Sequence, residues 1–240
     1  MTDPLETAKK FADELAVAFG DELRSVLLYG SVPRGEAVPG VSDINVLVLV
    51  ERIRLAGLGN VSSLARRWIE GGNTAPLLLS WHDWAHSADA FAVEIADMKQ
   101  HHKVLRGDDP LAELQVVLST LRHQTEHELR GKMVQLHEGL MLAAPKPEEL
   151  GRLLLTALPS FTTYLRTTLR LGGRAVPDRT EEMIPAAASV VGGEPDAFLR
   201  AWRARITGKA PAVRLDDPFV AGYYGLVERT VEWVDGLMDR

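Results

Sequence analysis

The apolar residues of this chain follow two different periods along its length. In the first 110 residues, short continuous apolar runs alternate with stretches whose apolar positions recur every three to four residues. Short apolar runs are typical of strands covered on both faces, and the longer period is typical of amphipathic helices. From residue 111 onward only the helical period remains. We therefore predict an α+β fold, with a small mixed β-sheet domain over residues 1–110 and an all-α helical bundle over residues 111–240.

The clearest strand pattern lies near the N-terminus. Residues 26–29 form an apolar run that stops at Gly30-Ser31, and residues 44–50 carry apolar side chains on both faces. This pattern predicts two buried strands joined by a polar loop. The loop contains four residues that favour turns, Pro33, Gly35, Pro39 and Gly40.

The remaining pattern predicts further elements on either side of a domain boundary. A third strand is expected over residues 75–79, a fourth over 91–96 and a brief edge strand at 104–105, with a helical turn containing His101-His102 between the last two. The Gly107-Asp108-Asp109-Pro110 turn is the expected boundary. Helices are expected over residues 4–19, 60–70, 80–87, 111–142, 148–171, 180–191, 195–207 and 217–238.

Two polar residues interrupt the start of the second buried strand. Asp43 and Asn45 are two positions apart, and alternate side chains of a strand point to the same face. Both side chains are therefore expected on one face at the N-terminal end of the strand. Such a pair either forms a site or satisfies backbone groups of the preceding loop.

The spacing of these residues resembles a known signature. Gly30-Ser31, eleven further residues and then Asp43-Ile44-Asn45-Val46 resemble the signature of the DNA-polymerase-β-like nucleotidyltransferases. The stretch from residue 76 to residue 110 also resembles the second half of bacterial nucleotidyltransferase-domain proteins. The resemblance implies that Gly30 and Ser31 hold the triphosphate of a nucleotide. It also implies that acidic residues after the loop, with a third acid on a neighbouring strand, hold two Mg²⁺ ions.

The resemblance assigns Asp43 and Asn45 as metal ligands, with Asn45 in place of the usual second acid. An amide oxygen can ligate Mg²⁺ but brings no negative charge, so the substitution should weaken the site. Asp43 could instead cap the preceding turn, and Asn45 could instead bridge backbone groups of the loop.

Glu94 is the expected third acid. It is the one charged residue in the apolar run 91–96, and a buried carboxylate requires a cation, a metal ion or an exposed edge. The resemblance implies a role as metal ligand or as general base, and the alternative is an edge-strand residue paired with Arg or Lys. Asp97 and Asp83 are weaker candidates for this role because both have the spacing of helix caps.

Arg34 lies in the loop where the resemblance places a triphosphate. Its planar guanidinium suits phosphate oxygens, and the alternative is a solvated loop residue. The segment from His123 to His127 has the His-x-x-Glu-His spacing of some zinc sites, but this short match is weak and has no apparent third ligand, so a polar helix face explains it better.

Composition narrows the classes of function. The chain has 240 residues, a net charge of −6 and no cysteine, which excludes a disulfide framework and cysteine-based zinc sites. An acidic balance disfavours nucleic acid as the main partner. The N-terminus lacks the pattern of a secretion signal, and no apolar run is long enough to span a membrane. We therefore expect a cytoplasmic protein.

These features lead to three hypotheses. The first is a Mg²⁺-dependent enzyme that transfers a nucleoside monophosphate from an NTP, ATP above all, to a small-molecule or protein acceptor. The second is a catalytically degenerate nucleotidyltransferase fold that binds a nucleotide or a partner without turnover, and Asn45 supports it. The third is an interaction protein whose helical half pairs two chains as a homodimer.

Overall fold

The computed structural model describes residues 3–38 and 40–239. The chain forms two compact units, Met1–Val116 and Val117–Arg240. The first unit extends six residues beyond the expected boundary at residue 110. Leu111 and Leu114 explain this difference, because both are buried in the core of the first unit rather than in a helix of the second.

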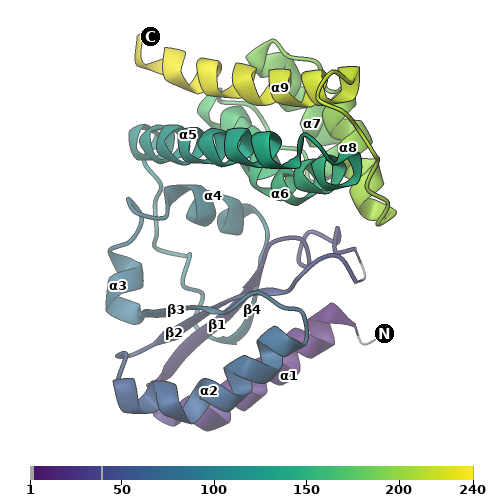
Figure 1. The fold of residues 1–240 in the computed structure, drawn as a ribbon. Coiled ribbons are helices and arrows are strands. Elements are labelled where there is room, and N and C mark those ends of the chain that lie inside the picture. The colour runs from purple at the N-terminus through teal and green to yellow at the C-terminus, as the bar shows by residue number, and fades with distance from the viewer. Residues whose placement is uncertain (1–2, 39, 240) are drawn as a thin grey trace. The chain divides into compact units, whose positions relative to one another are not determined.

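The first unit is built on a mixed sheet of four strands (Figure 1). The strands are β1 (Leu23–Tyr29), β2 (Asn45–Val50), β3 (Leu77–Ser80) and β4 (His102–Gly107), in the order β3-β2-β1-β4. β1 is antiparallel to both β2 and β4, whereas β2 and β3 are parallel. The α+β class and the small mixed sheet predicted from the sequence are confirmed.

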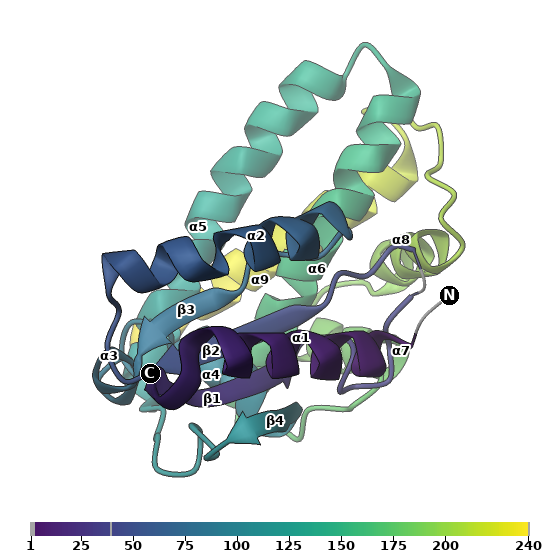
Figure 2. The ribbon, with the colours of Figure 1, turned by 90° about the horizontal axis from the view of Figure 1, so that it is seen from below.

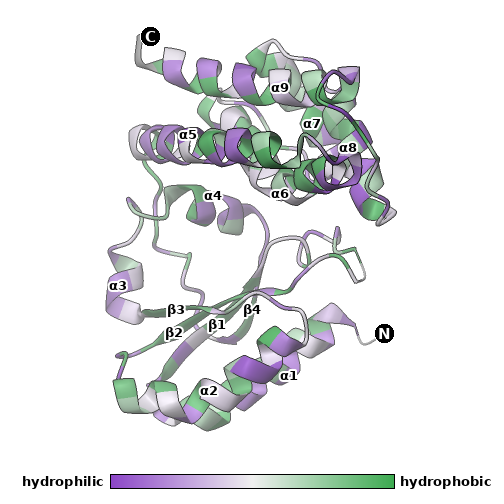
Figure 3. Ribbon diagram, viewed as in Figure 1, coloured by the Kyte–Doolittle hydropathy of each residue, from purple (hydrophilic) through white to green (hydrophobic). Residues whose placement is uncertain are grey.

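Helices cover both faces of this sheet (Figures 1 and 2). α1 (Pro4–Phe19) and α2 (Leu55–Glu70) lie on one face, and α3 (Trp81–Ala85) and α4 (Ala92–Gln100) lie on the other. Alternate residues of the strands enter two separate cores, so the central strands are apolar on both sides (Figure 3). The core under α1 and α2 includes Val26, Leu28, Val46 and Val48, and the core under α4 includes Leu27, Leu47 and Leu49.

The expected strand over residues 91–96 is wrong, because this segment belongs to helix α4. A short apolar run does not distinguish a strand from a buried helix. In the helix, Ile95 and Met98 are one turn apart and pack together on the sheet, with Leu47 in the same core. The sheet already has its edge strand in β4, which begins at His102 where a helical turn was expected.

Two helix bounds and two short elements also differ from those expected. α2 begins at Leu55 rather than near residue 60. The helix expected from residue 111 begins only at Leu118, because residues 111–116 complete the first unit. Two short 3₁₀ helices, Gly20–Glu22 and Gly236–Asp239, were not expected.

The second unit is helical, as the sequence pattern predicted. Its central helix, α6, contacts α5, α7, α8 and α9 and contributes most of its length to the core. No helix in the described part of the chain has both the length and the apolarity needed to cross a bilayer. The helices are α5 (Leu118–Ala143), α6 (Pro147–Leu171), α7 (Thr180–Val191), α8 (Asp196–Ile206) and α9 (Pro218–Asp235).

Gly107, at the end of β4, provides a test of the sheet register. It has a φ of 73°, and a Cβ there would overlap the carbonyl oxygen of Arg24 on β1. Gly72 has a φ of 85° but open space around it. We expect Gly72→Ala to lower the free energy of unfolding by about 1 kcal/mol, and Gly107→Ala to lower it by about 3 kcal/mol or more. Equal losses in urea denaturation would contradict the close approach of β4 to β1.

Candidate functional site

A tight turn directly after β1 forms the centre of the candidate site. Gly30 has a φ of 85°, and a Cβ on it would lie 2.9 Å from Nδ2 of Asn45. The chain then closes on itself, because the N–H of Gly35 donates to the carbonyl of Val32 at 3.0 Å and the N–H of Glu36 donates to that of Ser31 at 3.0 Å. The structure thus brings the Gly30-Ser31 turn and the start of β2 together, as the sequence pattern suggested.

Asp43 and Asn45 are held at this edge by the strand pairing and by the loop after α2. Asn45 pairs with Tyr29 across β1 and β2. Oγ1 of Thr74 donates a hydrogen bond to Oδ2 of Asp43, and the N–H of Ile44 donates to Oδ1 of Asn73 at 3.3 Å. Thr74 therefore orients the half-buried carboxylate of Asp43.

Asn45 points to the face of the sheet that α4 covers. Alternation along β2 places Asn45 on the same face as Leu47, which packs with Ile95 and Met98 of α4. Tyr29 packs against the same core. The site is therefore bounded by the ends of two strands and by one helix.

Glu94 approaches this site from α4 rather than from a strand. Burial raises the pKa of Tyr29 to about 12, and the negative charges of Glu94 and Asp43 add to the shift. Both carboxylates are thus close enough to the same phenol to affect its ionisation. At neutral pH the Tyr29 hydroxyl is protonated and can donate a hydrogen bond.

The strands next to β2 provide no third carboxylate. β3 is Leu77–Ser80 and β1 is Leu23–Tyr29, and neither contains Asp or Glu. Asp83, a weaker candidate, lies in the first turn of α3, where Ser80 is the N-cap and its Oγ accepts a hydrogen bond from the N–H of Asp83 at 3.0 Å. It follows the C-terminal end of β3, whereas Asp43 precedes the N-terminal end of the parallel strand β2.

Arg34 and Asp97 form a buried ion pair. Nη1 of Arg34 lies 2.8 Å from Oδ2 of Asp97, and the two side chains are only 8% and 14% exposed. Arg34 is therefore not a solvated loop residue, because it ties the turn to α4. Its Nε is buried without a hydrogen-bond partner among the described residues.

The donor set suits one magnesium ion rather than two. Mg²⁺ in nucleotide sites usually binds one or two carboxylates, phosphate oxygens and water. Asp43, the amide oxygen of Asn45 and a nucleotide phosphate fit that description. In the part of the chain that the structure describes, no three His, Asp or Glu side chains are grouped to hold a metal ion. A two-metal site with three carboxylates does not fit this arrangement.

Tyr29 and Thr74 were not anticipated from the sequence. Tyr29 directly precedes Gly30 and shares the strand face of Leu27, so alternation could have placed it in the site. Thr74 had no comparable signal, because its contact with Asp43 joins residues 31 positions apart through a loop.

Comparison with known proteins bears on the fold. No family model matches the sequence, and no curated protein matches it. Among solved structures, the chain is similar to the spectinomycin adenyltransferase AAD(9) from Enterococcus faecialis, in a structure with ATP and spectinomycin. The TM-score is 0.60 at 11% sequence identity, over 94% of this chain and 98% of that one. The chain thus has a nucleotidyltransferase-like fold over nearly its whole length.

The pKa of Tyr29 tests whether Glu94 faces the site. We expect Glu94→Gln to lower this pKa from about 12 towards the ordinary value of 10, but not to reach it, because burial remains the larger cause. Site-resolved NMR of ¹³C-labelled tyrosines would measure the titration, with the buried Tyr223 as internal control. An unchanged Tyr29 pKa would show that Glu94 points elsewhere.

The raised pKa of Tyr29 also makes the free energy of unfolding depend on pH. The folded state keeps the phenol proton between about pH 10 and pH 12, whereas the unfolded chain loses it near pH 10. The contribution of Tyr29 to the free energy of unfolding therefore falls as the pH rises through this interval.

Proposed function

We propose that the first unit binds a nucleoside triphosphate, ATP above all, with Mg²⁺, and that the protein transfers the nucleoside monophosphate to a small-molecule acceptor. The observation that carries this proposal is the placement of the Gly30-Ser31 turn against Asn45, with Asp43 at the same strand end. The nucleotidyltransferase-like fold supports it.

The turn supplies donors for the phosphates. Backbone N–H groups of a tight glycine-containing turn and a serine hydroxyl are suited to phosphate oxygens. Gly30 has no side chain, so a ligand can approach the backbone closely. Arg34 adds a guanidinium, whose planar set of N–H groups suits phosphate oxygens. Its pairing with Asp97 holds the planar group in one orientation.

Asp43 is the proposed magnesium ligand, with Asn45 as a neutral second ligand. When bound, the ion would neutralise phosphate charge and polarise the bond that breaks. Thr74 holds the Asp43 carboxylate by a hydrogen bond, which fixes the oxygen that faces the ligand. The same assignment explains why an acidic side chain remains at a half-buried strand end.

Glu94 is the proposed general base. It would accept the proton of the acceptor hydroxyl while that oxygen forms a bond to the α-phosphorus, and the bond to the bridging oxygen would break to release pyrophosphate. Tyr29 stays protonated at neutral pH because its pKa is about 12. Its hydroxyl can then donate a hydrogen bond to an oxygen that gains charge during the transfer.

A neutral or cationic small molecule is the acceptor class that the charge favours. The net charge of −6 repels polyanions such as nucleic acids. The similar solved structure contains spectinomycin, a small molecule, as well as ATP.

A second candidate function is nucleotide binding without turnover. Two observations favour it: Asn45 stands where the resemblance expects an acid, and the strands beside β2 carry no carboxylate. Pyrophosphate release separates the two candidates. Release with any member of a panel of hydroxyl-bearing acceptors supports the transferase, whereas Mg²⁺-dependent ATP binding without release supports the binding module.

Asp43 is the residue whose removal should weaken Mg²⁺-dependent nucleotide binding most. We expect Asp43→Ala to weaken Mg²⁺-dependent ATP binding at least about tenfold, because the carboxylate is the main charged ligand. Calorimetric titration with and without Mg²⁺ measures this change. Asp89→Ala, which removes an exposed carboxylate of the same unit, serves as control. Equal binding by wild type and Asp43→Ala would refute the ligand assignment.

Introducing a carboxylate at position 45 should have the opposite effect to Asp43→Ala and strengthen Mg²⁺ binding. Asn45→Asp keeps the size of the side chain and adds a negative charge, so we expect tighter Mg²⁺ binding in the presence of ATP and faster pyrophosphate release. Magnesium titration followed by nucleotide fluorescence measures the first effect. If the substitution leaves both unchanged, Asn45 does not face the metal.

A further inference from the structure

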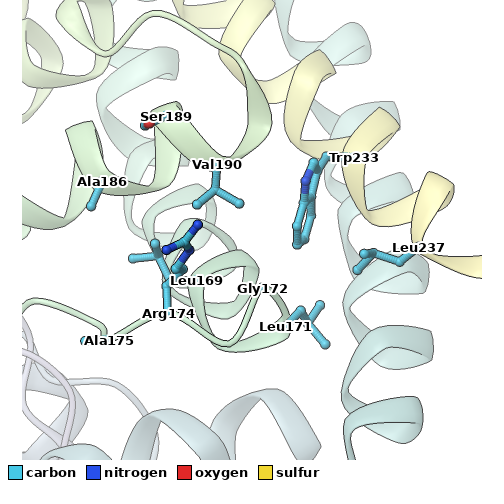
Figure 4. A pocket seen from close by; sticks show the side chains of 10 residues that line it. All are labelled: Leu169, Leu171, Gly172, Arg174, Ala175, Ala186, Ser189, Val190, Trp233 and Leu237. Atoms are coloured by element: carbon cyan, nitrogen blue, oxygen red, sulfur yellow. The ribbon is translucent and has the colours of Figure 1, made fainter. Parts of the chain in front are cut away.

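The second unit contains a hollow of about 800 Å³ that lies apart from all residues discussed so far (Figure 4). This volume is within the range of small-molecule sites in proteins. It is formed by the end of α6, the loop that follows, α7 and α9. The lining residues are Leu169, Leu171, Gly172, Arg174, Ala175, Ala186, Ser189, Val190, Trp233 and Leu237.

The wall of this hollow combines polar and apolar surface and includes one flat aromatic side chain. The Trp233 indole lies over Gly172, since a Cβ on Gly172 would be 3.6 Å from Cζ2 of the indole. In Figure 4, Val190 and Leu171 lie beside the indole. An indole face with aliphatic neighbours favours a ligand with a flat apolar ring.

The backbone around the end of α6 fixes the position of Arg174. Gly173 has a φ of 64°, its N–H donates to the carbonyl of Arg170 at 3.0 Å, and the N–H of Arg174 donates to that of Leu169 at 2.8 Å. These two bonds form a Schellman motif, which gives the residue after the glycine a defined direction. The Arg174 guanidinium and the Trp233 indole lie on opposite sides of the hollow (Figure 4).

The polar side chains of the lining are those of Arg174, Ser189 and Trp233, which carry a guanidinium, a hydroxyl and an indole N–H. Among the described residues, no hydrogen bond or ion pair involves the side chain of Arg174, Ser189 or Trp233. The lining contains no Asp or Glu. A guanidinium, an indole N–H and a hydroxyl around one hollow complement an anion rather than a cation.

We propose that this hollow binds a small organic anion in which a carboxylate is attached to a flat apolar ring. Arg174 would hold the carboxylate through its paired N–H groups, and the ring would lie against Trp233. The proposal does not depend on the function proposed for the first unit.

Calorimetric titration of the full chain with 2-naphthoate and with the neutral 2-naphthamide tests the site. We expect saturable binding of the naphthoate, at least about tenfold tighter than that of the amide. Arg174→Gln should weaken naphthoate binding about tenfold and leave amide binding unchanged. As a control, Arg152→Gln removes an exposed arginine of α6 and should leave the binding of naphthoate and of naphthamide unchanged.

The position of the ligand needs a second readout. The indole N–H resonance of Trp233, identified by its loss in Trp233→Phe, should shift on addition of naphthoate. The proposal is overturned if naphthoate and naphthamide bind equally, if neither binds saturably, if Arg174→Gln has no effect, or if binding leaves the Trp233 resonance unmoved.

Discussion

The buried ion pair between Arg34 and Asp97 is the interaction on which the candidate site depends. Removing two charges from water is costly, and a buried charge that loses its partner destabilises a protein by about 3–5 kcal/mol. The turn after β1 therefore stays against α4, with a distance of 2.8 Å between the two charged groups. Ser31 lies within this turn, so the direction of its backbone also depends on α4.

The same helix determines the charges around the phenol of Tyr29. α4 places Glu94 near Tyr29 and Asp97 on Arg34, while Asp43 reaches Tyr29 from the start of β2. Asn45 avoids adding another negative charge to this group. A nucleotide brings its own negative charge, so a site with few carboxylates and a paired arginine suits a single magnesium ion carried with the phosphates.

The sequence predicted the parts of the fold that depend on local pattern. The strand pair β1 and β2, helix α1 and the Gly30-Ser31 turn follow from apolar runs and turn residues, and the structure confirms them as elements. Residues 91–96 were misassigned because a short apolar run fits both a strand and a buried helix. The pairing of Arg34 with Asp97 joins residues 63 positions apart, and no periodic pattern encodes such a contact.

A crystal structure with Mg²⁺ and a non-hydrolysable ATP analogue tests the central claim most directly. Our account predicts the triphosphate against the backbone of residues 30–34, with Arg34 on a phosphate oxygen and the magnesium ion on the Asp43 carboxylate. A nucleotide bound away from this turn, or a metal ion that does not contact Asp43, would contradict the account.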